Sequence, residues 1–148
     1  MILDDHHNSI WESFKNPTDT ILPGQTLHID TRLRSCQSLK NYSEGRFQLS
    51  LQLDGNLFLY SMSNQIHEKA YFATMTMNWA SQLIFTEAGY MFINGGNNLI
   101  HNLTMKDPGP KESLYHMAII DYDGIFQTIQ PPHKGGHHRL WELFFLMD

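Results

Sequence analysis

Apolar and polar residues alternate in the run Arg46-Phe47-Gln48-Leu49-Ser50-Leu51-Gln52-Leu53-Asp54-Gly55-Asn56-Leu57-Phe58-Leu59-Tyr60. A period of two residues is typical of a β-strand that buries one face. The pair Asp54-Gly55 in its middle indicates either a tight hairpin turn or a bulge. The run therefore predicts β structure whose buried face consists of Leu49, Leu51, Leu53, Leu57 and Leu59.

The same pattern occurs twice more, in residues 83–93 and 117–126. The central glycines, Gly55, Gly89 and Gly124, are 34 and 35 residues apart. Tetratricopeptide units have a similar period, but they are pairs of helices, whereas these units are rich in strand-forming residues with a glycine at the turn. Three similar β units predict an all-β fold in which the units close around an axis.

Size and composition indicate a single folded unit with a packed core. The chain has 148 residues, of which 41% are hydrophobic and 17% are charged. The net charge is -5 and the basic residues are scattered, so we predict no nucleic-acid partner. Residues 1–7 lack the features of a secretory signal, and the longest apolar run, within residues 140–147, is too short to span a membrane. The chain is therefore expected to contain no transmembrane segment.

Cysteine and histidine usage gives no support for a metal site or a cofactor. Cys36 is the only cysteine, so it is either a free thiol or half of a bridge whose partner lies elsewhere. Histidines are grouped at residues 6–7, 133 and 137–138, but adjacent histidines in a strand point to opposite faces and no cysteine accompanies them. We predict that these histidines lie in solvated loops and that no metal is bound.

Enzyme signatures are weak. Asp121 and Asp123 could form a carboxylate pair for glycoside hydrolysis. However, Asp123-Gly124 occupies the turn position of Asp54-Gly55, which favours a role in a turn. The chain contains no nucleophile elbow, phosphate-binding loop or kinase signature. We predict that it is not an enzyme.

The face opposite the leucines has the residue types that recognise sugars. A carboxylate accepts hydrogen bonds from sugar hydroxyls, an amide donates and accepts, a phenol donates, and an apolar side chain covers the C–H face of a pyranose. An ordinary solvent-facing strand with a turn would show the same alternation, so the pattern alone leaves both interpretations open. The candidate sugar-binding residues are Gln52, Asp54, Asn56, Phe58 and Tyr60.

These five residues closely resemble the mannose-binding signature of bulb-type lectins, Q-x-D-x-N-x-V-x-Y, with Phe58 in place of valine. Residues 10–25 resemble the W-x-S-F-x-x-P-T-D-T-x-L-P-G-Q stretch of plant G-type (S-domain) lectin receptor-like kinases. Later segments, including residues 82–85 and 118–126, keep the order found in the same ectodomains. The resemblance covers about residues 3–130.

The resemblance implies the fold known as β-prism II, in which three four-stranded sheets surround a pseudo-threefold axis and each sheet can hold one mannose. Only the first repeat has a nearly complete signature, and its Phe58 is bulkier than valine and narrows the pocket. The two other sites are expected to be inactive. Their corresponding residues are Thr86, Ala88, Tyr90, Phe92 and Asn94 in the second repeat, and Asp121, Asp123, Ile125, Gln127 and Ile129 in the third.

The resemblance also implies a domain organisation. Residues 1–30 are expected to end a first bulb-lectin module and form a connector, 31–130 to form a bulb-type lectin module, and 131–148 to be an unassigned tail. Trp11, Phe14 and Leu22 are expected to be core or corner residues. The chain is then a fragment without the kinase, or a truncated gene product.

The expected function is a mannose-type carbohydrate-binding module from the extracellular region of a plant receptor-like kinase, at the plasma membrane or secreted. Its expected partners are a mannose-containing glycan or a cell-surface ligand, and an oligomer could form through the lectin module. The alternatives are a ligand-recognition scaffold with degenerate sugar sites, which binds proteins, or a fragment without function.

Two tripeptides fit the N-glycosylation pattern. They begin at Asn41 and Asn102, whereas the tripeptide that begins at Asn16 is excluded by its proline. We predict Asn41 and Asn102 as glycosylation sites, in agreement with an extracellular protein.

Overall fold

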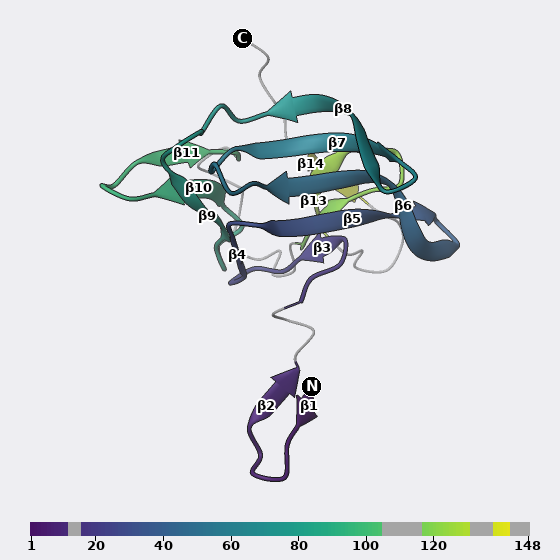
Figure 1. The fold of residues 1–148 in the computed structure, drawn as a ribbon, viewed down its shortest axis with the longest axis vertical. Coiled ribbons are helices and arrows are strands. Elements are labelled where there is room, and N and C mark those ends of the chain that lie inside the picture. The colour runs from purple at the N-terminus through teal and green to yellow at the C-terminus, as the bar shows by residue number, and fades with distance from the viewer. Residues whose placement is uncertain (12–15, 105–116, 131–137, 143–148) are drawn as a thin grey trace.

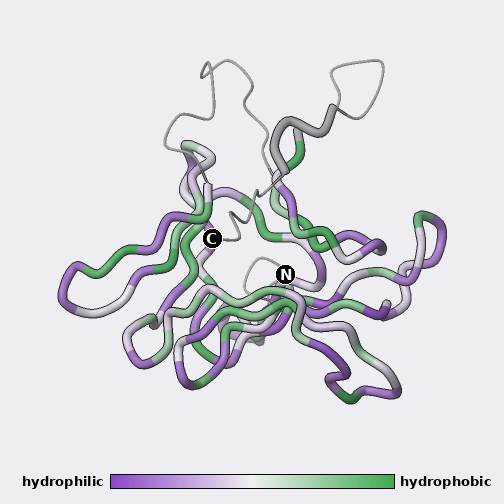
Figure 2. The backbone as a smooth tube through the Cα atoms, turned by 90° about the horizontal axis from the view of Figure 1, so that it is seen from above, coloured by the Kyte–Doolittle hydropathy of each residue, from purple (hydrophilic) through white to green (hydrophobic). Residues whose placement is uncertain are grey.

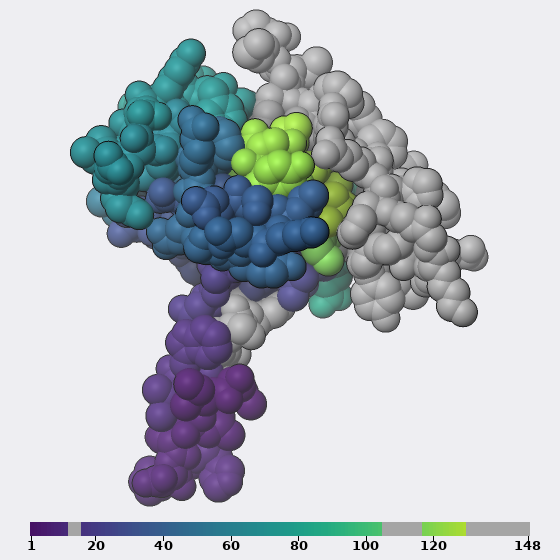
Figure 3. Space-filling view, turned by 90° about the vertical axis from the view of Figure 1, so that its right-hand side faces the viewer, coloured from purple at the N-terminus to yellow at the C-terminus, as the bar shows by residue number. Residues whose placement is uncertain are grey.

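The computed structural model describes residues 1–11, 16–104, 117–130 and 138–142, and these residues form strands and turns without a helix. A small hairpin, β1 (Ile2–Leu3) and β2 (Ser9–Trp11), comes first. Figures 1 and 3 show this hairpin projecting from the rest of the molecule. No helix among the described residues is long and apolar enough to cross a membrane.

Three antiparallel sheets of four strands follow. The first sheet has the order β5 (Thr31–Ser38), β6 (Asn41–Leu51), β7 (Leu57–Ser63) and β8 (Ile66–Ala73). The second has the order β11 (Ile100–Asn102), β10 (Met91–Gly95), β9 (Ala80–Phe85) and β4 (Thr26–His28). The third has the order β14 (His138–Glu142), β13 (Phe126–Gln130), β12 (Met117–Ile120) and β3 (Thr20–Ile21).

Seen from above, the strands lie around a common centre (Figure 2). Alternate residues of each sheet face this centre and form a single apolar core, as the period of two requires. The prediction of an all-β fold with three four-stranded sheets is confirmed. The side chains that are almost completely buried in the core include Leu33, Leu49, Leu51, Leu57 and Leu59 of the first sheet, Leu27, Leu83, Phe85, Met91 and Ile93 of the second, and Ile21, Ala118, Ile120 and Phe126 of the third.

The three repeat glycines occupy equivalent turns. Gly55, Gly89 and Gly124 have φ angles of 83°, 91° and 87°, a region that favours glycine because it has no Cβ. In the first turn, the Gly55 N–H donates to the Gln52 carbonyl (2.9 Å) and the Gln52 N–H donates to the Asn56 carbonyl (2.9 Å). The same two bonds recur in residues 86–90 and 121–125. Asp54-Gly55 therefore lies in a three-residue hairpin loop that ends in a left-handed glycine.

The first loop also explains one wrong prediction. Leu53 was expected on the buried face with the other leucines, but 77% of its surface is exposed. Strand β6 ends at Leu51, so Leu53 lies in the hairpin loop, where the alternation of a strand no longer applies.

The N-terminal block differs from the expectation in two ways. Residues 20–28, assigned to a connector, contribute β3 and β4, which pair with β12 and β9 of the sheets. Trp11 and Leu22 are 44% and 43% exposed, so neither is a core residue, although Leu22 does lie at a corner between two strands. Trp11 lies in a hairpin of only two strands, and Leu22 lies in a turn between β3 and β4. Phe14 lies outside the described residues.

A contact between the first and third sheets involves the third glycine. The Tyr71 hydroxyl donates to the Gly124 carbonyl at 2.6 Å. Burial and, to a smaller extent, the Asp123 carboxylate raise the pKa of Tyr71 above its ordinary value, which keeps the hydroxyl protonated as a donor. A Cβ on Gly124 would lie 2.7 Å from the Phe47 ring, which also packs edge-on against Tyr71. The turn therefore needs glycine for packing as well as for its φ angle.

Cys36 is a half-buried free thiol on β5. Burial raises its pKa above the ordinary value, and the carboxylates of Asp19 and Asp121 raise it further. The thiolate, which is the reactive form, is therefore disfavoured at neutral pH. Within the described part of the chain, no three histidine, cysteine or acidic side chains come together in a group that could hold a metal ion.

Candidate functional site

The five residues of the sugar-binding signature lie at the end of the β6–β7 hairpin, on the outer face of the first sheet. Gln52 and Asp54 belong to the loop, and Phe58 and Tyr60 lie on β7, where they alternate with the buried Leu57 and Leu59. Gln52, Asp54, Phe58 and Tyr60 are half-buried. Asn56 is almost completely buried, with 2% of its surface exposed.

Gln52, Asp54 and Tyr60 keep polar groups that are available to a ligand. Asp54 Oδ1 accepts from the Asn56 backbone N–H (2.9 Å), which leaves Oδ2 without a partner among the described residues. Gln52 Nε2 donates to the Tyr60 hydroxyl (2.8 Å). Because Tyr60 accepts this bond, its own proton can be donated to a ligand, and Gln52 Oε1 can accept. These three side chains thus present two acceptors and one donor.

Asn56 joins this loop to the segment that follows β8. Its Oδ1 accepts from Thr74 Oγ1 (3.2 Å) and from the Thr76 backbone N–H (3.3 Å), and all three residues are buried. Its Nδ2 donates no hydrogen bond among the described residues. Asn56 therefore holds the loop in place and has only its amide nitrogen available for a ligand.

An aromatic stack lies beside the loop. The rings of Phe58 and Tyr60 are 5.2 Å apart and nearly parallel (24°), and the His67 imidazole of β8 stacks on Tyr60 at 4.0 Å and 2°. His67 Nε2 also lies 3.0 Å from Gln48 Nε2, so the ring is held on both its face and its edge. Phe58 is thus one end of a three-ring stack. Sequence analysis missed His67, because its place depends on the register of β8 against β7.

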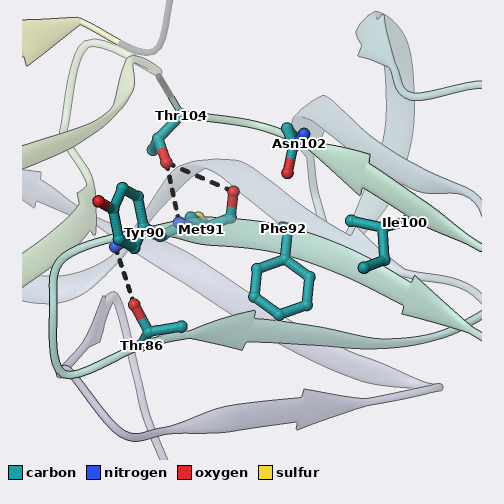
Figure 4. Close-up of a pocket in the computed structure, with 7 residues that line it drawn as sticks. All are labelled: Thr86, Tyr90, Met91, Phe92, Ile100, Asn102 and Thr104. Atoms are coloured by element: carbon teal, nitrogen blue, oxygen red, sulfur yellow. Dashed lines mark hydrogen bonds between the residues drawn. The ribbon is translucent and has the colours of Figure 1, made fainter. Parts of the chain in front are cut away.

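The second sheet has a pocket of about 320 Å³ on its outer face (Figure 4). Phe92 lies between Tyr90 and Ile100 in the view of Figure 4, and Asn102 lies across from Phe92 on β11. Thr86, Tyr90 and Phe92 are the counterparts of Gln52, Asn56 and Phe58 when the repeats are aligned on their glycines. The pocket therefore occupies the place of the second candidate site, with a largely apolar surface. Its lining consists of Thr86, Tyr90, Met91, Phe92, Ile100, Asn102 and Thr104.

In the third sheet the carboxylates of Asp121 and Asp123 accept hydrogen bonds from backbone N–H groups of the turn in which they lie. Asp123 Oδ1 accepts from the Ile125 N–H (3.1 Å), as Asp54 Oδ1 accepts from Asn56. Asp121 accepts from the Tyr122 N–H (2.7 Å) through Oδ1 and from Gln127 Nε2 (3.5 Å) through Oδ2. Both aspartates thus make hydrogen bonds within the turn, as the repeat of Asp-Gly predicted.

The two sequon asparagines lie at different places. Asn41 is exposed next to the turn between β5 and β6, where its carboxamide oxygen accepts from the Ser43 hydroxyl (2.7 Å). Asn102 is exposed at the end of β11, which is the edge strand of the second sheet. Residues 131–137 and 143–148, most of the unassigned tail, lie outside the described residues.

Plant receptor kinases are among the relatives of this chain. The G-type lectin S-receptor-like serine/threonine-protein kinases LECRK2 and LECRK3 of Oryza sativa subsp. indica are 37% and 39% identical over 134 and 135 residues, or 89% and 88% of this chain. The kinase RLK1 of Arabidopsis thaliana, of the same description, is 31% identical over 136 residues, or 86% of the chain. The chain spans only 16% of the length of each. No family model matches the chain.

Solved structures of lectins have the same fold. The monomeric mannose-binding lectin of Gastrodia elata matches with a TM-score of 0.56 and 20% identity, over 86% of this chain and 98% of that protein. The lectin of Polygonatum cyrtonema, solved in complex with monomannoside, matches with a TM-score of 0.57 and 18% identity, over 80% and 98%. At these identities the likeness establishes the fold, the β-prism of the bulb-type lectins.

Proposed function

This chain is a homologue of one segment of the G-type lectin S-receptor-like kinases and has the bulb-lectin fold, and from that premise we propose that it is a carbohydrate-binding module. Its ligand is a mannose-type glycan, held on the outer face of the first sheet. Two of the proteins that share the fold are described as mannose-binding or as complexed with monomannoside.

The observation that supports this proposal most strongly is the set of polar groups that remain available to a ligand at the first loop and on the adjoining strand β7. Asp54 Oδ2 and Gln52 Oε1 accept from neighbouring sugar hydroxyls, and the Tyr60 hydroxyl donates to a third. The outer side of Phe58 covers the C–H face of the ring. The second and third repeats lack this set, because their corresponding positions are occupied by Thr86, Ala88 and Asn94 and by Asp121, Asp123 and Ile129.

Binding at one such loop is weak. A single monosaccharide on a half-buried surface makes few contacts, so a dissociation constant in the millimolar range is expected. Useful avidity then requires several copies of the module or a multivalent glycan. An oligomer, or a cell-surface ligand with repeated mannose units, meets this need.

The same proposal covers the setting of the module. It acts outside the cell, as the region of a receptor-like kinase that meets the ligand, and it performs no catalysis itself. Residues 31–130, with the strands of residues 20–28 and 138–142, form the lectin module.

Substitution Asp54→Ala tests the site. We expect methyl mannoside binding to fall at least tenfold, because the alanine removes the acceptor that points at the sugar. The matched control is Asp123→Ala, which removes the equivalent turn bond in the third repeat. This substitution is expected to leave the dissociation constant within about twofold of the wild type, because Asp123 lies away from the sugar site of the first sheet.

Isothermal titration or ligand-observed NMR of the three proteins measures the difference. Equal loss in both variants would show that the turns act on folding and not on sugar recognition. Absence of any response in the wild-type protein at high mannoside concentration would favour a scaffold that binds a protein ligand.

A further inference from the structure

The pocket of the second sheet contains the side chain of a glycosylation sequon. Asn102 is part of its lining, together with Phe92 and Ile100, and it is followed by Leu103 and Thr104. The Asn102 carboxamide makes no hydrogen bond within the described residues, and the residue is exposed. A glycan attached to Asn102 would therefore start at the lining of the pocket.

The register of the strands places Asn102 next to Phe92. Phe92 of β10 lies directly opposite Asn102 of β11. Side chains in such a pair have their Cβ atoms about 4.5–5.5 Å apart and stand on the same face of the sheet. A pyranose ring bonded to Nδ2 of Asn102 can therefore reach the Phe92 ring.

We propose that an N-linked glycan on Asn102 folds back into the second-sheet pocket, with its first N-acetylglucosamine packed on Phe92. The C–H face of the sugar covers the Phe92 ring and the exposed part of Ile100, which is 56% exposed without it. Thr86 and Tyr90 line the other end of the pocket (Figure 4). Thr86 Oγ1 accepts from the Tyr90 N–H (3.0 Å), which leaves its proton for a sugar oxygen.

Because the glycan is covalently attached, weak contacts are sufficient to keep it in the pocket. A tethered ligand does not lose translational freedom again on binding, so its effective concentration at the pocket is high. The pocket holds about 320 Å³, which lies at the lower end of the range for small-molecule sites and suits one or two sugar rings. The glycan thereby fills the place of the second sugar site from within the same chain.

Asn41 provides the comparison inside the same protein. It is exposed beside a turn of the first sheet, and its neighbours Tyr42 and Leu39 are 85% and 71% exposed. A glycan there extends into solvent. We therefore expect the glycan on Asn102 to pack against the protein and the glycan on Asn41 to remain in solvent.

This inference requires passage through the secretory pathway, but it does not depend on sugar binding at Asp54. Its test uses the 148-residue chain secreted from a eukaryotic host as two single-site forms, Asn41→Gln and Asn102→Gln. Intact mass establishes which sites are modified, and thermal unfolding is followed before and after removal of the whole glycan.

Removal from Asn102 is expected to lower Tm by about 2–4 °C, whereas removal from Asn41 changes Tm by less than about 1 °C. After treatment with an endoglycosidase that leaves the first sugar on the asparagine, the protein is expected to keep the higher Tm, because the first ring makes the contact. It also cleaves the native protein several times more slowly at Asn102 than at Asn41.

Phe92→Ala, made in the Asn41→Gln form, separates the contact from stability in general. The glycan no longer raises Tm in this variant, whatever the Tm of the bare variant is. An unmodified Asn102 in the secreted chain, or the same Tm change and cleavage rate at both asparagines, overturns the inference. An unchanged glycan effect in Phe92→Ala also overturns it.

Discussion

Substitution Gly55→Ala is expected to lower the free energy of unfolding by about 3 kcal/mol, a large fraction of the stability of a small domain. Two costs add. The residue has φ of 83°, where an L side chain is strained, and its new Cβ would lie 2.6 Å from the Ala80 carbonyl oxygen. Ala80 begins β9 of the second sheet, so relief of the clash must move backbone between two sheets.

Gly96→Ala is the matched control for this substitution. Gly96 lies in the loop after β10, and a Cβ there meets no atom within 4 Å. Its free energy of unfolding should remain within about 0.5 kcal/mol of the wild type. Urea denaturation of the three proteins measures both effects, and a similar midpoint for Gly55→Ala and Gly96→Ala would contradict the structure of the turn.

Asn56→Ala is expected to cost about 2–3 kcal/mol of stability and to abolish methyl mannoside binding. The substitution leaves the buried Thr76 N–H without its acceptor and removes one partner of the buried Thr74 hydroxyl. It also removes the amide nitrogen, the one group of Asn56 that is available to a ligand. Chemical denaturation gives the first effect, and titration at a temperature where the variant is folded gives the second.

Asp54→Ala separates these two roles. Asp54 is half-buried and makes one hydrogen bond inside the loop, so its loss is expected to cost about 1 kcal/mol or less. Both variants should lose binding, but only Asn56→Ala should lose much stability. Equal destabilisation by the two substitutions would show that Asn56 does not connect the loop to Thr74 and Thr76.

The sequence predicted the fold well because its signals are local. The alternation of Leu49, Leu51, Leu57 and Leu59 needs only the geometry of one strand, and all four are buried. The repeated glycines needed only their spacing, and the three turns have the same pattern of hydrogen bonds. The prediction that Leu53 is buried was wrong because the alternation of the strand was extended across a loop.

The candidate site could be predicted only in part, because its remaining features depend on strand register. Tyr60 stacks on His67 since β7 and β8 are neighbours, and no local pattern indicates this pairing. Similarly, Asn102 reaches the second-sheet pocket because it is paired with Phe92. The burial of Asn56 could not be predicted without knowing that residues 74–76 pack against the first loop.

The most direct test of the proposed function is an NMR titration of the isotope-labelled chain with methyl mannoside. We predict that chemical shifts change at the side-chain amides of Gln52 and Asn56 and at the rings of Phe58, Tyr60 and His67. The corresponding residues of the second and third sheets should remain unchanged. Shifts confined to another sheet, or no shifts at mannoside concentrations well above the millimolar range, would contradict a sugar site on the first sheet.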